Sequence, residues 1–135
     1  MKRGFSLIEI LLAVALFSLV ASLFIFLIIE SYKMSETARD VVLATDLAEE
    51  GMEVVRSIRD YKFADLKNGT YGLAIENNRW ILKGRSELIG KFTRQIIISS
   101  AGTNRKKIEA VVFWQPRTGP RREVRLFSRI TNWVR

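Results

Sequence analysis

The sequence predicts an α+β protein in which a long amino-terminal helix packs against a carboxy-terminal antiparallel sheet of four or five strands. Three observations lead to this prediction. Residues 10–29 carry no charge, residues 34–58 place apolar side chains at helical spacing, and short runs of alternating character follow residue 60. The first half of the helix is therefore expected to be membrane-spanning, and the second half amphipathic with one face on the sheet.

The uncharged stretch from Ile10 to Ile29 is long enough to cross a lipid bilayer. Its twenty residues, at about 1.5 Å of rise each, span roughly the 30 Å hydrocarbon core. Lys2 and Arg3 precede the stretch, and Glu9 lies directly before it. A carboxylate is costly to insert at this position, and residues 10–29 supply no Lys, Arg or His. Glu9 is therefore expected to have a cationic partner from elsewhere.

Residues 1–29 resemble the class III signal of type IV pilins and pseudopilins. The resemblance rests on a short basic leader, Gly4, Phe5, a small hydroxyl residue, two aliphatic residues, Glu9 and about twenty apolar residues. It implies cleavage by prepilin peptidase between Gly4 and Phe5, methylation of the new amino terminus on Phe5, and an assembly role for Glu9.

The same resemblance implies partners and a location. The partners are prepilin peptidase, other pilin or pseudopilin subunits, an inner-membrane assembly platform, and membrane lipid before assembly. The implied location is the inner (cytoplasmic) membrane, crossed once with the carboxy-terminal domain outside the cytoplasm, and then the pilus or pseudopilus filament.

Cleavage after Gly4 would also supply the missing counter-charge of Glu9. The free α-amine on Phe5 has a pKa near 8 and is largely cationic at neutral pH. It can pair with Glu9 of the same subunit or of a neighbour in a filament. Removing one partner of such a buried pair typically costs about 3–5 kcal/mol, so the pair would enforce the register of assembly.

Three other interpretations explain less of the amino terminus. A secretory signal peptide could be cut after Ala13-Val14-Ala15, but residues 16–29 would remain as an apolar tail and Glu9 would interrupt the apolar region. A plain signal anchor accounts for the length and for Lys2 and Arg3, but not for the Gly4-Phe5 and Glu9 arrangement. A buried helix of a soluble domain is disfavoured, because 135 residues cannot surround a helix that is apolar on every face.

The composition provides no candidate active site. The chain has no Cys and no His, which removes disulfides, thiolate metal sites and the most common general base. No nucleotide-binding or nucleophile motif appears, so no enzymatic activity, cofactor or metal site is expected. The predicted organisation is a leader at residues 1–4, an apolar helix at 5–29, an amphipathic extension at 30–60 and a sheet domain at 61–135.

The amphipathic half predicts that the helix runs unbroken from Phe5 to about Asp60. Gly51 lies on the apolar face, where it would permit close approach of the sheet or, alternatively, cause a local kink. No Pro occurs in this range, whereas pilin helices often carry one. The apolar face comprises Val41, Ala44, Ala48, Met52, Val55 and Ile58, and an acidic stripe of Asp46, Glu49, Glu50, Glu53 and Asp60 lies roughly opposite.

Residues 47–56 resemble the helix end of certain minor pilins and I-type minor pseudopilins. This similarity implies a minor subunit, although an amphipathic helix with a solvated acidic face accounts for the same residues. The function expected from the whole pattern is a structural subunit of a type IV pilus or of a type II secretion pseudopilus. The alternatives are a DNA-binding pilin-like subunit for DNA uptake and a signal-anchored surface domain that does not polymerise.

The remainder of the chain predicts strands joined by turns. Residues 71–76 and 79–83 form a hairpin around Asn77-Asn78, because Asn tolerates positive φ. Further strands are expected at 92–99, where Ile96-Ile97-Ile98 suggests burial on both sides, and at 107–115 and 123–131, where apolar residues alternate. Residues 61–68 and 100–106 are expected to be a connector and a polar loop, and residues 116–120 a turn.

Charge is divided unevenly along the chain. Residues 31–60 carry seven acidic and four basic residues, a net charge of −3, whereas residues 61–135 carry sixteen basic and five acidic residues, a net charge of +11. These charges suggest that basic loops contact the acidic stripe of an identical or related neighbouring subunit, because complementary charge governs register and encounter. A solvated helix face and a generally basic surface account for the same residues equally well. Nucleic acid is the other partner that these residues suggest, without specificity. The basic residues concerned are Arg105, Lys106, Lys107, Arg117, Arg121 and Arg122.

Overall fold

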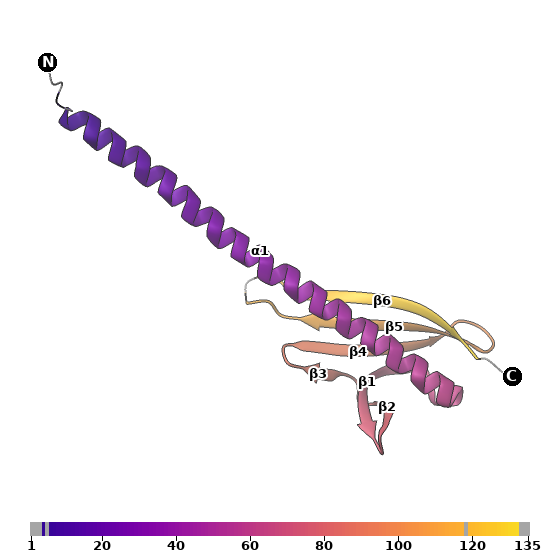
Figure 1. The fold of residues 1–135 in the computed structure, drawn as a ribbon. Coiled ribbons are helices and arrows are strands. Elements are labelled where there is room, and N and C mark those ends of the chain that lie inside the picture. Colours follow the sequence, from indigo (N-terminus) through magenta and orange to yellow (C-terminus); the bar gives the residue numbers. More distant parts are fainter. Residues whose placement is uncertain (1–3, 5, 118, 133–135) are drawn as a thin grey trace. The chain divides into compact units, whose positions relative to one another are not determined.

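A computed structural model describes residues 4, 6–117 and 119–132, and it confirms the α+β class (Figure 1). The chain divides into two compact units, Met1–Arg39 and Asp40–Arg135. Helix α1 (Leu7–Tyr61) contributes to both units, and a single 3-10 turn, η1 (Phe63–Asp65), follows it. The strands are β1 (Gly69–Glu76), β2 (Arg79–Lys83), β3 (Glu87–Ile89), β4 (Phe92–Ser100), β5 (Arg105–Trp114) and β6 (Arg122–Thr131).

The six strands form one antiparallel sheet, in which five follow the order β2-β1-β4-β5-β6 and β3 pairs with β4 off this path. Strand β4 pairs with β5 along its whole length, from Phe92↔Trp114 to Ser100↔Lys106. On its other side β4 pairs with β3 near its start and with β1 near its end. The β5–β6 ladder is continuous from Arg105↔Thr131 to Trp114↔Arg122. All of these pairings lie within the second unit.

The long helix is confirmed, and its assignment continues across Gly51. The hairpin at Asn77-Asn78 is also confirmed, since their φ angles are 50° and 60° and left-handed conformations at both positions are those of a tight two-residue hairpin turn.

The number of strands was underestimated, because the sheet has six rather than four or five. The missed strand is β3, which has only three residues and is therefore too short to display an alternating pattern. The predicted loop at 100–106 was also too long, because β5 begins at Arg105. The first residues of β5 are charged and therefore show no apolar alternation in the sequence, although their backbone pairs with both neighbouring strands.

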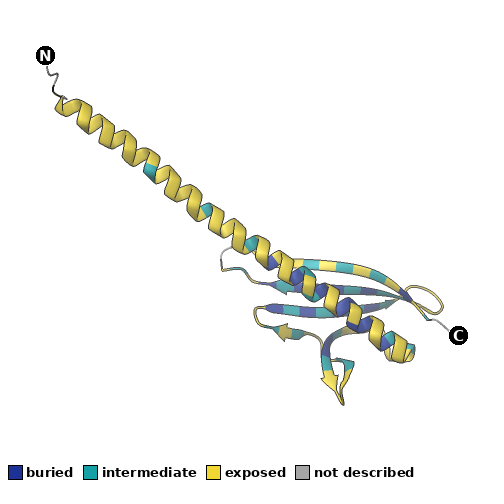
Figure 2. Ribbon diagram, in the orientation of Figure 1, coloured by how far each residue is buried: buried dark blue, intermediate teal, exposed yellow. Residues whose placement is uncertain are grey.

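The core forms between the second part of α1 and one face of the sheet (Figure 2). Of the predicted apolar stripe, Val41 is exposed, and the buried residue at that turn is Asp40. The remaining predicted helix positions are buried, and Val54 joins them. The sheet contributes Leu73, Phe92, Ile96, Ile98, Ile108, Ala110, Val112, Trp114 and Ile130.

Burial along the strands follows the period of two that strands impose. In β5 and β6 the even-numbered residues, Ile108 to Trp114 and Val124 to Ile130, are the less exposed set of the predicted alternation. In β4 the prediction of burial on both sides was wrong, because buried and half-buried residues alternate. The inward set of β4 includes Arg94, which is only 1% exposed.

Candidate functional site

The first unit presents a helix with apolar side chains on every side. The seventeen Leu, Ile, Val and Phe side chains between Leu7 and Ile29 are each 48% to 75% exposed. By length and composition, α1 contains a segment able to cross a membrane. An apolar surface of this extent on a single chain is typical of a membrane or protein contact. This apolar surface is therefore the candidate contact site of the first unit.

Glu9 lies in the first turn of this helix. The Glu9 and Ile10 amides donate to the Ser6 carbonyl at 3.0 and 3.2 Å, which begins the helical hydrogen-bond pattern. A carboxylate is favoured by about 0.3–1 kcal/mol at this positive end of a helix dipole. The Glu9 side chain is exposed, and no ion pair involves it among the described residues. Gly4 is exposed, whereas Lys2, Arg3 and Phe5 lie outside the described residues.

Comparison with known protein families identifies this amino terminus. Residues 1–28 match the family model of the prokaryotic N-terminal methylation motif. The chain carries a prepilin leader of the type IV pilin and pseudopilin kind. No similar curated protein and no similar solved structure was found.

The motif supports a type IV pilin-like or pseudopilin precursor. A prepilin leader implies processing by prepilin peptidase and assembly with other pilin subunits. With the apolar helix, it supports a membrane-anchored pilin that is later assembled into filaments.

All five residues of the acidic stripe of this pilin-like precursor are exposed, but several already have partners in the same chain. Glu50 accepts a hydrogen bond from Arg94 at 3.0 Å, Glu53 pairs with Arg56 at 2.9 Å, and Asp60 pairs with Arg59 at 2.7 Å. Asp46 and Glu49 have no ion pair among the described residues. The contact with a neighbouring subunit remains a prediction.

The predicted basic residues do not form one patch. Lys106 donates to the Asn68 side chain at 2.7 Å, and Lys107 pairs with Glu109 at 2.8 Å. Arg121 stacks on the Phe113 ring, with its guanidinium carbon 3.6 Å from the ring centre. Strands extend by about 3.3 Å per residue, so residues 105–107 and 117–122 lie about 30 Å apart, at opposite ends of the β5–β6 hairpin. Residues 105–107 belong to β5 and Arg122 to β6, so only Arg117 and Arg121 lie in a loop as predicted.

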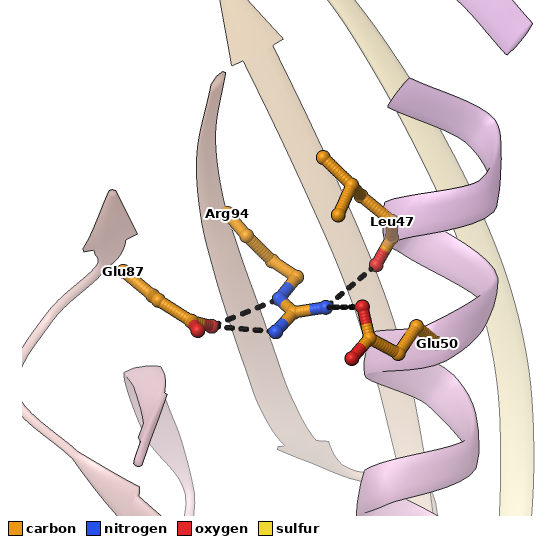
Figure 3. Close-up of polar contacts among 4 residues, drawn as sticks. All are labelled: Leu47, Glu50, Glu87 and Arg94. Atoms are coloured by element: carbon orange, nitrogen blue, oxygen red, sulfur yellow. Dashed lines mark hydrogen bonds and ion pairs between the residues drawn. The ribbon is translucent and has the colours of Figure 1, made fainter. Parts of the chain in front are cut away.

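Sequence reasoning missed the most constrained polar group of the second unit, the buried Arg94 (Figure 3). Its Nε and Nη2 donate to Glu87 Oε2 at 3.0 and 2.6 Å. Its Nη1 donates to Glu50 Oε2 at 3.0 Å and to the Leu47 carbonyl at 2.9 Å. One guanidinium thus connects β4, β3 and α1, and its hydrogen bonds offset the cost of burying a charge.

Gly51 makes room for Arg94. A Cβ at Gly51 would lie 3.1 Å from both Arg94 Cδ and Ile96 Cδ1, closer than an ordinary van der Waals contact. This confirms the predicted close approach of the sheet. The signal that could have revealed the buried arginine was its position in β4, in phase with Phe92, Ile96 and Ile98.

A second ion pair, with only its carboxylate buried, connects α1 to the same hairpin. Lys91 Nζ lies 2.6 Å from Asp40 Oδ1, and the Asp40 side chain is only 9% exposed. Lys91 stands in the turn between β3 and β4. The β3–β4 hairpin is therefore held to α1 at two points by oppositely charged side chains.

Proposed function

We propose that this pilin-like precursor is a minor structural subunit of a type IV pilus or type II secretion pseudopilus, cleaved after Gly4 and methylated on the amine of Phe5. The observation that supports the proposal most strongly is the methylation motif across residues 1–28. A structural role is consistent with the exposed features of the described residues, which are an apolar helix and charged side chains.

The exposed apolar helix supports assembly into a filament. In the membrane, lipid covers the side chains from Leu7 to Ile29, and in a filament the equivalent helices of neighbouring subunits would replace the lipid. Glu9 would then leave the interfacial region for an apolar interior, where an unpaired carboxylate is costly. The amine that cleavage frees on Phe5 of the same or a neighbouring subunit neutralises it. Only subunits with the correct axial stagger place the Phe5 amine next to the Glu9 carboxylate, so that neither charge is left unpaired.

Mass spectrometry of the amino-terminal peptide tests the processing step. We expect the mature protein to begin with N-methyl-Phe5, and Gly4→Leu to leave an unprocessed precursor in the membrane. Ser6→Ala, next to the cleaved bond but not part of it, is the matched control and should be processed normally. A mature terminus at Leu16 would assign the chain to ordinary signal peptidase instead.

The basic leader supports an orientation with the amino terminus in the cytoplasm. Positively charged flanks are retained on the cytoplasmic side, so Lys2 and Arg3 would direct the sheet domain to the outer face. Reporters that are active only outside the cytoplasm, fused after Asn132, should be active. Activity of a cytoplasm-only reporter at the same site would contradict the orientation.

The charge division supports a contact between neighbouring subunits. Glu49 and Glu53 are exposed on α1, and Arg117 and Arg121 are exposed on the β5–β6 connection. Reversal of Glu49 and Glu53 to Lys should weaken assembly more at low salt than at high salt. Additional reversal of Arg117 and Arg121 to Glu should restore part of the assembly. If the combined variant assembles no better than the variant with the two glutamates reversed, the contact is excluded. Glu50 is left unchanged, because it binds Arg94.

A further inference from the structure

A groove runs between the second part of α1 and the edge strand β6. It has a volume of about 520 Å³, with Glu49, Glu50, Met52, Glu53 and Arg56 on the helix side and Leu126, Phe127 and Ser128 on the strand side. Both walls belong to the unit Asp40–Arg135. Met52 and Leu126 supply apolar surface, and three carboxylates line the same groove.

The strand side of the groove is a sheet edge. Among the described residues, β6 pairs with β5 alone. The Asn132 amide donates to the Asn104 carbonyl at 2.9 Å, one step beyond the register pair Arg105↔Thr131. Backbone groups of successive strand residues point to opposite sides, so even-numbered residues of β6 bond to β5. The residues that direct their N–H and C=O groups to the free edge are Glu123, Arg125, Phe127, Arg129 and Thr131.

The helix side of the groove is acidic. Glu49 has no ion pair in the described part of the chain, and the Glu53 side chain is 73% exposed despite its pairing with Arg56. Glu50 also faces the groove, with half of its side chain exposed, although Arg94 holds one of its oxygens. With Arg56 and Arg94 counted against these three carboxylates, the wall keeps a net negative charge, which favours a cationic occupant.

We propose that this groove binds an extended, basic polypeptide segment of a partner protein, which adds to β6 as a further strand. Side chains of an added strand alternate between the two faces of the sheet. Lys or Arg at every second position would therefore face Glu49 and Glu53. The residues between them would meet Phe127, which is 60% exposed, on the opposite face.

The dimensions of the groove suit such a segment. From Glu49 to Arg56 the helix rises about 10 Å, which corresponds to about three residues of extended chain. The strand side contributes three residues, Leu126 to Ser128. Arg125 does not oppose the basic residues, because its side chain lies on the other face and already pairs with Glu109 and Glu123 at 3.0 and 3.2 Å.

Fluorescence anisotropy with the full chain in detergent micelles tests the proposal. The probe is a short labelled peptide with Lys at alternate positions and Thr or Val between them, and empty micelles serve as the blank. We expect binding that weakens with salt and that is absent when Glu replaces Lys in the peptide. Glu49→Gln with Glu53→Gln should lower the affinity about tenfold. Asp46→Asn with Asp60→Asn, which removes the same charge outside the groove, should change it less than about twofold.

Strand addition has its own controls. Phe127→Pro removes an outward amide without breaking the β5 ladder and should abolish binding, whereas Phe127→Ala and Thr131→Pro should retain most of it. Two further peptides carry N-methyl groups on alternate amides, one on the odd and one on the even positions. Methylation of the amides that point to β6 should abolish binding, and methylation of the other set should preserve it. Equal effects of the two acidic pairs, equal binding of the two methylated peptides, or no binding of the Lys peptide would overturn the proposal. The test uses the unassembled subunit, so its outcome does not depend on the filament role.

Discussion

The apolar side chains of helix α1 have different surroundings before and after Arg39. In the first unit its apolar residues are exposed on all sides, whereas in the second a single buried stripe packs on the sheet of the same chain (Figure 2). Individual carboxylates also differ in their partners. Asp40 and Glu50 find Lys91 and Arg94 within the chain, while Glu9 has no ion pair among the described residues. The part of the helix that the chain leaves uncovered is the part that points to assembly.

The largest effect should come from Glu9, which has no ion pair among the described residues. Glu9→Leu removes a charge that only another amine can neutralise, so the protein should still insert in the membrane but enter filaments at least about tenfold less than the unaltered chain. Quantitative immunoblotting of sheared filaments and membranes measures the ratio. Glu30→Gln is the control, because Glu30 already pairs with Lys33 at 2.7 Å. Normal incorporation of Glu9→Leu would remove the register argument.

The buried arginine should dominate the stability of the second unit. Arg94→Ala removes the cation that Glu87 and Glu50 bind and opens a cavity, so unfolding should become easier by about 2–4 kcal/mol. Near-ultraviolet circular dichroism from Trp114, which is 2% exposed, follows the transition.

Membrane insertion of Arg94→Ala should be unchanged, since the first unit does not contain this contact. Arg129→Ala, an exposed arginine of β6, should leave the melting temperature unaltered. Replacing Glu87 by Leu together with Arg94 by Met should recover part of the loss, because an apolar substitute avoids the burial of charge. Wild-type stability of Arg94→Ala would show that its hydrogen bonds only balance the cost of burying it.

Gly51 tests how closely the helix and sheet must approach. Gly51→Leu forces Arg94 and Ile96 to move and should destabilise the second unit by about 1–3 kcal/mol. Gly51→Ala should fall within about 1 kcal/mol of the unaltered protein, because a gain in helix propensity offsets the tight Cβ contact at 3.1 Å. Thermal unfolding compares the two variants, and a stable Gly51→Leu would mean that the interface yields easily.

The second ion pair should contribute less than the arginine cluster. Asp40→Asn removes the charge that Lys91 binds, and because Lys91 is 47% exposed and can be hydrated, the loss should be about 1 kcal/mol. The exposed Asp46→Asn is the control on the same helix. Denaturant unfolding of both variants gives the difference, and an equal effect would deny Asp40 its role.

The smallest expected effect concerns pH. On the sheet face away from α1, hydrogen bonds from Lys107 and then Arg125 lower the pKa of the Glu109 carboxyl below its usual 4.5, against the opposing effect of desolvation. A carboxyl whose pKa is depressed on folding stabilises the protein above its unfolded pKa, and this contribution disappears as the pH falls through the folded value. In Glu109→Gln the free energy of unfolding should therefore fall less steeply with decreasing pH below about pH 4.5. Its dependence on pH near neutrality should not change. An unchanged acid limb would show that the pairing is too weak to matter.

Strand and helix positions could be predicted where the sequence pattern and the burial pattern coincide. The alternation in 107–115 and 123–131 and the Asn77-Asn78 turn gave correct elements, because backbone geometry and one-sided burial act locally. Strand β3 could not be found in this way. Its three residues form a strand because β4 pairs with them. Gly72 also leaves room for the preceding residue Ser86, whose backbone lies 2.6 Å from the position that a Cβ of residue 72 would occupy.

The amino acid sequence by itself determined the prepilin leader, the membrane-length apolar segment and the α+β order of elements. These features depend on consecutive residues, so composition and spacing suffice to specify them. Only the tertiary structure decided that Arg94 and Asp40 are buried, that Glu50 is committed to its own sheet, and that Glu49 and Glu53 border a free strand edge. A charged residue shows its environment only when segments distant in the chain meet: Glu50 and Arg94 are 44 positions apart, and the energy of burying one depends on the presence of the other.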